Sequence, residues 1–209
     1  MARTAGSAAD DTRQRILDVA VDLFIEQGYA GTSVRDISER LGMTKGSLYY
    51  HFASKEDVLN AIVTPLIEDL DRFVADADAA PGRIDRDLLV RLVNILDEHG
   101  ALLRSLMGDP SVLHGLANRQ EMPHRIAALR RALADSDEPT ALLRGRCALG
   151  VINAGAVAPR FDPLREPVSS GGPSPGSDQA NKRGARTRLT EPEKQLVVDA
   201  ALAVLAISD

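Results

Sequence analysis

Apolar residues recur at the spacing of an α-helix almost throughout this chain of 209 residues, and glycines interrupt the pattern near its start. Three short amphipathic segments follow one another there, at 12–29, 32–42 and 44–52. Gly28 and Gly42 stand where the residue after a helix is expected. Because the links are only about three residues long, these helices must turn sharply against one another. The sequence therefore predicts a helix-turn-helix formed by the second and third helices and supported by the first.

Longer helical segments follow. The first spans 54–79 and contains Pro65, where a kink is expected. Further helices are predicted at 83–99, 101–107, 120–135, 140–158 and 191–207. Residues 161–190 are rich in Pro, Gly and Ser, a composition that cannot bury enough apolar surface to order itself, so a flexible loop is predicted. The predicted fold class is all-α, with a helix-turn-helix domain over 1–55 and a larger helical-bundle domain over 56–209.

Composition is typical of a soluble globular protein. The apolar content of 44% supports a sizeable core, which must be aliphatic because aromatic residues make up only 3%. The N-terminus has no apolar leader, and the longest apolar runs are shorter than the roughly 20 residues that cross a bilayer, so no membrane association is expected. The single cysteine, Cys147, excludes an internal disulfide and fits a reducing cytoplasm. It is predicted to be a small buried residue.

The residues give no sign of catalysis or of metal binding. The four histidines lack the spacing to a cysteine or carboxylate that metal ligands need. No nucleophile–histidine–acid order, phosphate-binding loop or paired carboxylates stand out. The chain is therefore predicted not to be an enzyme, and neither a cofactor nor a metal is expected.

The segment 40–55 combines positive charge with aromatic side chains. It holds three Lys or Arg residues and no acidic residue, although the whole chain has a net charge of -5, and three of the seven aromatic residues lie within 49–52. Such a segment suits phosphate and sugar contacts. Leu48 and Phe52, four residues apart, are expected to face inward. Aromatic residues on a short helix are also typical of a core, so these residues alone leave DNA binding and core packing both open.

The order of residues in this region carries a resemblance. Residues 15–59 read RILDVAVDLFIEQGYAGTSVRDISERLGMTKGSLYYHFASKEDVL. This is a helix ending in Phe-x-x-x-Gly-Tyr, then Gly-Thr-Ser-Val-x-x-Ile, then Gly-x-x-Lys-Gly-Ser-Leu-Tyr-Tyr-His-Phe-x-Ser-Lys-Glu. Residues 12–59 thus resemble the DNA-binding domain of the tetracycline-repressor (TetR) family of bacterial regulators. The rest of the chain is similar to that family only in the number and order of its helices.

The resemblance implies specific DNA contacts. Phosphate contacts are implied for Thr32 or Ser33, Thr44, Tyr50, His51 and Lys55. Base contacts are implied for Arg35, Lys45, Gly46, Ser47 and Tyr49. The N-terminal arm departs from a strongly basic pattern, since it carries Arg3, Arg13 and Arg15 against Asp10 and Asp11. Little minor-groove contact is therefore expected from it.

The resemblance also implies a mechanism. The expected function is that of a ligand-responsive regulator, most often a repressor, which binds a palindromic double-stranded DNA operator as a homodimer. A small-molecule effector in the C-terminal domain would shift the helix after Ser54 and release the DNA. The scarcity of aromatic residues favours an apolar or amphipathic effector. The predicted pocket residues are Phe73, Asn94, Met107, His114 and Asn153.

The last predicted helix, 193–207, is apolar on most sides and so must bury more than one face. It is predicted to pair with the helix around 145–158 in a four-helix dimer interface. The predicted interface residues are Ala148, Ile152, Ala154, Leu196, Ala200, Val204 and Ile207. The alternative, that both helices lie wholly inside one monomer, stays open.

A different class of function also stays open. Residues 1–60 hold seven Lys or Arg and nine Asp or Glu, so the N-terminal region is net negative by two charges. A ligand-binding or protein-interaction module with little DNA affinity is compatible with that balance.

Overall fold

The computed structural model describes residues 5–79, 84–107, 112, 122–134, 136–157 and 188–207. Within these residues the chain forms nine helices and no strand, which confirms the all-α prediction. The helices are α1 (Ala5–Gly31), α2 (Val34–Leu41), α3 (Lys45–His51), α4 (Lys55–Ala79), α5 (Arg86–Glu98), α6 (Gly100–Met107), α8 (Met122–Ala132), α9 (Pro139–Ala156) and α10 (Glu191–Leu205). The predicted loop 161–190 lies outside the described residues except at 188–190.

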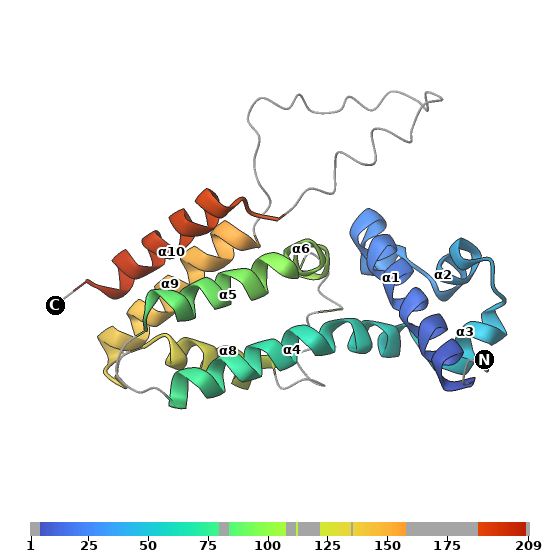
Figure 1. Ribbon diagram of the computed structural model, residues 1–209, viewed down its shortest axis with the longest axis horizontal. Coiled ribbons are helices and arrows are strands. Elements are labelled where there is room, and N and C mark those ends of the chain that lie inside the picture. The colour runs from blue at the N-terminus through green and yellow to red at the C-terminus, as the bar shows by residue number, and fades with distance from the viewer. Residues whose placement is uncertain are drawn as a thin grey trace, which may run out of the picture.

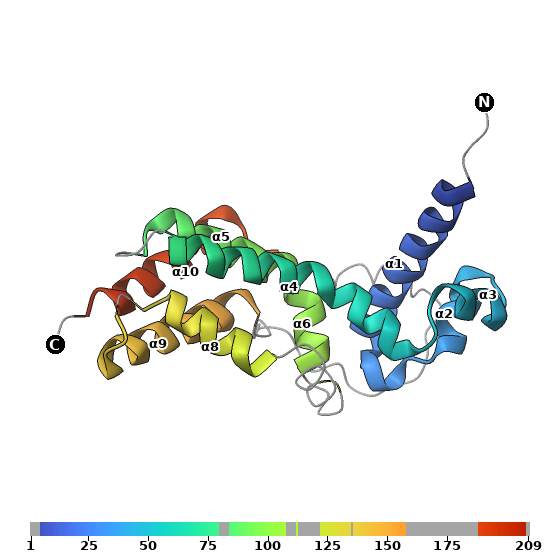
Figure 2. The same cartoon turned by 90° about the horizontal axis from the view of Figure 1, so that it is seen from below.

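The molecule is elongated, with α1, α2 and α3 at one end (Figure 1). The helix α4 runs from this end along the length of the molecule. Helices α5 and α8 pack against its second half, and α9 and α10 pack in turn on them and on each other (Figures 1 and 2). Pro65 lies inside α4, which continues as one helix to Ala79. No helix among the described residues is both long and apolar enough to span a bilayer.

The first helix is longer than its sequence pattern predicts. It begins at Ala5, upstream of the expected start near residue 12, and continues to Gly31 across a break at Gly28. Gly28 has a φ of 78° and Gly42 a φ of 66°, both in the left-handed region that glycine adopts at little cost. These two glycines therefore mark the turns that the sequence predicted, although the first lies within the helical span and not after it.

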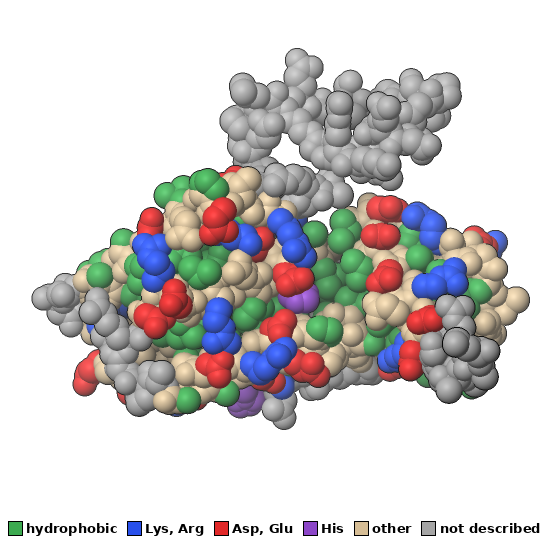
Figure 3. Space-filling view, viewed as in Figure 1, with side chains coloured by type: hydrophobic (Ala, Val, Ile, Leu, Met, Phe, Trp, Pro, Cys, Tyr) green, Lys and Arg blue, Asp and Glu red, His purple; other side chains and the backbone are tan. Residues whose placement is uncertain are grey.

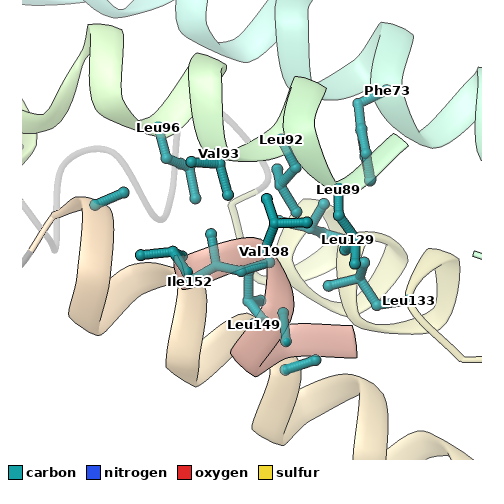
Figure 4. Packing of buried hydrophobic residues seen from close by; sticks show 14 of the residues in the cluster. Phe73, Leu89, Leu92, Val93, Leu96, Leu129, Leu133, Leu149, Ile152 and Val198 are labelled. Carbon is teal, nitrogen blue, oxygen red and sulfur yellow. The ribbon is translucent and has the colours of Figure 1, made fainter. Parts of the chain in front are cut away.

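Two apolar clusters form the interior. The larger one joins α4, α5, α8, α9 and α10, and Figure 4 shows how Phe73, Leu92 and Ile152 converge in it. The smaller one lies under the helix-turn-helix and includes Val58 of α4. Leu102 and Leu106 of α6 belong to this smaller cluster. Helix α6 and the first half of α4 thus pack with the N-terminal helices, although they follow the predicted boundary at residue 55.

Glycines allow α9 to approach its neighbours closely. A β-carbon added at Gly145 would lie 2.6 Å from the carbonyl oxygen of Arg130, near the end of α8, and 3.0 Å from that of Leu133, just beyond it. A β-carbon added at Gly155 would collide with the side chain of Val197 on α10. Both crossings therefore require glycine, because backbone and β-branched atoms cannot move aside cheaply.

A buried carboxylate fixes the start of α10. Asp97 of α5 accepts a hydrogen bond of 2.6 Å from the backbone N–H of Leu189, and its other oxygen lies 3.3 Å from Nζ of Lys194. Lys194 also donates to the amide oxygen of Asn94. The pairing satisfies a carboxylate that would be costly to bury alone. It holds α10 against α5 where the chain returns from the segment 158–187.

Substitution of Gly145 tests the α8–α9 crossing. Gly145→Ala is expected to lower the free energy of unfolding by about 1–3 kcal/mol, because the added methyl group meets backbone oxygens. Urea denaturation measures this change. Gly31→Ala is the matched control, since its nearest neighbour would be an ordinary contact of 3.8 Å and its change should stay within about 0.5 kcal/mol. Equal stability of the parent and Gly145→Ala would contradict the crossing.

Candidate nucleic-acid interface

Capping interactions fix where α2 begins. The hydroxyl of Ser33 accepts a hydrogen bond from the backbone N–H of Asp36, and the Asp36 carboxylate accepts one of 2.7 Å from the backbone N–H of Ser33. The Ser33 hydroxyl also donates to this carboxylate. These bonds from Ser33 lower the pKa of the Asp36 carboxyl below its ordinary value. The exposed Ser33 thus holds the start of α2 and lies at the surface.

The helix α3 has one buried and one exposed face. The Thr44 hydroxyl accepts a hydrogen bond of 3.1 Å from the N–H of Ser47 and so caps its start. Leu48 and Phe52 are buried, which confirms that they face inward. On the outer face Tyr49 is 51% exposed and Tyr50 84% exposed. The other exposed residues there are Thr44, Lys45, Gly46 and Ser47, and His51 is half-buried.

Arg13 of α1 fixes the far end of α3, which sequence reasoning did not foresee. Its guanidinium donates a hydrogen bond of 3.1 Å to the carbonyl of His51 and lies 4.1 Å from the ring centre of Phe52. Both the C-terminal end of a helix and the face of an aromatic ring attract a cation. From the sequence, Arg13 counted only as a charge of the N-terminal arm, because a contact across 38 positions has no local signal.

Two of the predicted phosphate contacts point inward. Thr32 is only 1% exposed, and its hydroxyl donates to the carbonyls of Leu23 and Gly28. The Lys55 ammonium donates at 2.8 Å to the carbonyls of Tyr29 and Thr32 and lies 4.0 Å from the centre of the Tyr29 ring. Both side chains tie α1, α2 and α4 together, so we leave them out of the interface.

The exposed arginines near the interface have acidic partners. Arg35 lies 2.6 Å from Glu39 one turn further along α2, and Arg40 lies 2.8 Å from Glu26 of α1. Exposed pairs of this kind are weak and can exchange for phosphate. Arg35 therefore stays in the interface, together with Ser33, Thr44, Tyr50, His51 and the four residues at the start and centre of α3.

The predicted pocket residues do not come together. Phe73 is buried in the larger core, Asn94 bonds to Lys194 at the surface, and Met107 is 57% exposed on α6. Asn153 is half-buried on α9, and His114 lies outside the described residues. None of the four described residues lines either of the two cavities described below. The scarcity of aromatic residues suggested Phe73, but its ring fills the core.

The predicted interface residues divide into two groups. Ala148 and Ile152 are buried in the core of their own chain and cannot meet a partner. The other five residues are partly or fully exposed: Ala154, Leu196, Ala200, Val204 and Ile207. Cys147 corrects a further expectation, since it is exposed and not buried. Helical periodicity gave the correct helices, but it could not tell which of two apolar faces turns inward.

Replacement of Lys55 tests its internal role. Lys55→Met is expected to lower the free energy of unfolding by about 1–3 kcal/mol, because two carbonyls lose a charged hydrogen-bond donor. Lys45→Met removes the same charge from an exposed position and should change stability by no more than about 0.5 kcal/mol. Urea denaturation measures the stability of the two variants. A Lys55→Met variant as stable as the parent would contradict the internal role of Lys55 and make it available for phosphate contact.

Known proteins share this arrangement. Residues 16–62 match the family described as bacterial regulatory proteins, tetR family. The transcriptional repressor KstR2 of Rhodococcus jostii is 44% identical over 68 residues, which cover 30% of this chain and 33% of the relative. The transcriptional repressor DhaR of a Mycobacterium species is 32% identical over 100 residues, covering 46% and 50%. The chain thus spans about a third to a half of the length of these curated relatives.

Solved structures extend the likeness of the fold. Mycobacterium smegmatis AmtR has a TM-score of 0.59 at 19% identity, covering 94% of this chain and 87% of its own. Salmonella enterica GusR has a TM-score of 0.54 at 22% identity, covering 94% and 96%. At these identities the likeness concerns the fold. Residues 16–62 thus match the helix-turn-helix region of bacterial regulatory proteins of the tetR family, and the rest of the chain shares the fold of these solved structures.

Proposed function

We propose that this protein is a DNA-binding transcriptional regulator, in the simplest case a repressor, which reads a double-stranded operator with α3. The observation that carries the proposal is the outer face of α3. There Lys45, Tyr49 and Tyr50 are exposed, while Leu48 and Phe52 hold the helix to the core. A helix presented in this way fits the major groove, where side chains reach base edges.

The side chains on this face suit two kinds of contact. Lys45 and Tyr49 lie where base edges would be read, and Gly46 and Ser47 let the DNA approach closely. Ser33, Thr44, Tyr50 and His51 surround them with groups that bond phosphate oxygens. Phosphate contacts set orientation and base contacts set sequence preference. Arg35 on α2 would exchange its exposed partner Glu39 for the DNA backbone or a base.

A two-fold homodimer completes the proposal. The helices α9 and α10 lie side by side, and hydrophobic side chains appear along the outer edge of α10 (Figures 1 and 3). Each helix carries apolar or small residues that are partly or fully exposed and share one face. They are Cys147, Gly150 and Ala154 on α9, and Leu196, Ala200, Ala203 and Ile207 on and just beyond α10.

This outer face suits a copy of itself. Leu196 is 68% exposed and Ile207 is 60% exposed, which is costly for large apolar side chains gathered on one face. Small residues on α9 allow close approach of a second pair of helices. A two-fold dimer would present two copies of α3 to a palindromic operator, whose half-sites lie about 34–36 Å apart.

Helix α6 offers a route from an effector to the DNA. Its Arg104 donates a hydrogen bond of 3.3 Å to the carbonyl of Val157 at the end of α9, and the next residue, Ser105, donates to the carbonyl of Phe24 on α1. One short helix thus touches both the bundle and the DNA-binding helices. A small molecule that binds the bundle better in its released arrangement would lower DNA affinity.

Substitutions on α3 test the DNA proposal. Lys45→Ala and Tyr49→Ala are each expected to weaken operator binding by about 1–3 kcal/mol, because each removes a contact to the groove. The operator is obtained by sequencing the DNA that the protein enriches from a genomic library, and affinity is measured by fluorescence anisotropy at fixed salt. Arg72→Ala, which removes an exposed charge from α4, should bind as the parent does. Unchanged affinity of both α3 variants would exclude this orientation.

A charge on the outer face of α10 tests the dimer. Leu196→Glu is expected to convert a dimer into monomers at micromolar concentration, because each chain would bury a carboxylate without a cationic partner in the interface. Met107→Glu adds the same charge at an exposed apolar residue of α6 and should leave the molar mass unchanged. Light scattering measures both. A monomeric parent protein, or a dimeric Leu196→Glu variant, would count against the proposed interface.

A further inference from the structure

Helix α8 lies between α4 and α9 (Figure 2). Two neighbouring cavities lined by residues of these helices form one open cleft. The larger has a volume of about 860 Å³ and the smaller about 270 Å³. They share Val74, His124 and Ala128, so the cleft is continuous along α4 and α8. Its larger part falls within the roughly 300–1,000 Å³ that small-molecule sites occupy.

The smaller cavity is apolar and electrically neutral. Leu70 of α4 and Met122, Ile126 and Leu129 of α8 line it. Its two charged residues bind each other, because Arg125 donates hydrogen bonds of 3.0 and 2.8 Å to the two carboxylate oxygens of Asp71. A bidentate pair of this kind offers little net charge to a ligand. This part of the cleft therefore suits a hydrocarbon chain.

The larger cavity is cationic at the crossing of α8 and α9. Arg130, Arg131 and Arg146 line it, and Asp78 is its one carboxylate among the described residues. The close contact at Gly145 brings the end of α8 against the first half of α9, next to Arg146. Arg131 lies 3.3 Å from Asp137, but both side chains are largely exposed and such a pair is weak.

Arg130 and Arg146 lack the carboxylate partners that several other arginines have. Within the described part of the chain, no ion pair or hydrogen bond engages either guanidinium, whereas Arg35, Arg86 and Arg125 all have carboxylate partners. A guanidinium presents a planar set of donors that matches a carboxylate or a phosphate. Two such groups at one end of an apolar cleft leave a site that an anion would neutralise.

We propose that this cleft binds an amphipathic anion, in which an extended apolar chain ends in a carboxylate or phosphate group. The apolar chain lies along α4 and α8, and the anionic group meets Arg130 and Arg146. As the effector of the regulator, which rests on the function proposed above, such a ligand would bridge α4 and α9 and change the position of α4 relative to the DNA-binding helices.

The experiment uses the full chain and a fluorescent fatty acid, dansylated undecanoic acid, as the probe. Arg130→Gln and Arg146→Gln are each expected to raise its Kd roughly tenfold, because each removes a charged hydrogen-bond donor. Arg86→Gln removes the same charge from the α5–α10 side of the bundle and should leave the Kd unchanged. Decanoate and decyl phosphate should displace the probe, and decanol and decyltrimethylammonium should compete at least tenfold less well.

Each other outcome has a defined meaning. Equal displacement by decanol, or an unchanged Kd in both arginine variants, overturns the anion site. Probe binding that disappears when the protein associates at higher concentration shows that a second copy covers the cleft, which also overturns it. Operator affinity without the probe is measured separately. If the chain binds the probe as described but binds no DNA, the anion site stands and the proposed function as a DNA-binding regulator fails.

The regulatory role has its own readout. Saturating decanoate is expected to weaken operator binding of the parent at least fivefold and to leave that of Arg130→Gln unchanged at the same concentration. A parent protein that binds decanoate with its operator affinity unaltered has the site but not the switch, and the effector assignment then fails.

Discussion

The orientation of α3 depends on an apolar cluster that it shares with helices far along the chain. Leu48 and Phe52 pack with Phe24 of α1, whose ring meets that of Tyr29 edge-on at 5.2 Å. The same cluster takes in the first half of α4 and the inner face of α6. Since a close-packed interior transmits displacement instead of absorbing it, α4 and α6 cannot move without disturbing the surface on which α3 rests. A displacement in the larger core can therefore reach α3.

Most of the cationic side chains around α3 bind partners within the chain. Arg13 holds the end of α3, Lys55 joins three backbone segments, and Arg40 is paired with Glu26. Lys45 remains on the outer face with the two exposed tyrosines. A net-negative domain that commits its cations in this way offers DNA few long-range attractions. Close-range contacts from tyrosine, serine and threonine side chains would then contribute more of the affinity, and binding would depend less steeply on salt.

Local pattern predicted the helices and their order, because apolar spacing and glycine positions are local signals. It also predicted the inward turn of Leu48 and Phe52. The resemblance implied phosphate contacts for Thr32 or Ser33 and for Lys55, whereas the structure buries the Thr32 hydroxyl and directs the Lys55 ammonium to carbonyls 23 and 26 positions away. On α9 the sequence pattern placed Ala148 in the dimer interface and Cys147 in the core, whereas Ala148 is buried and Cys147 is exposed. The pattern could not separate the two, because α9 is apolar on several sides. The arginine-lined cleft depends on three helices meeting, and no single stretch of sequence shows it.

The distribution of tyrosine has a practical consequence for spectroscopy. The chain contains no tryptophan and three tyrosines, at positions 29, 49 and 50. Tyr29 is buried beneath Lys55, while the other two project from α3. Tyrosine fluorescence of the unlabelled protein thus arises entirely from the helix-turn-helix end, with one tyrosine inside it and two on its surface. A quencher dissolved in the solvent would reach only Tyr49 and Tyr50. Quenching therefore distinguishes a change at the outer face of α3, which alters these two tyrosines, from a loosening of the fold, which exposes Tyr29.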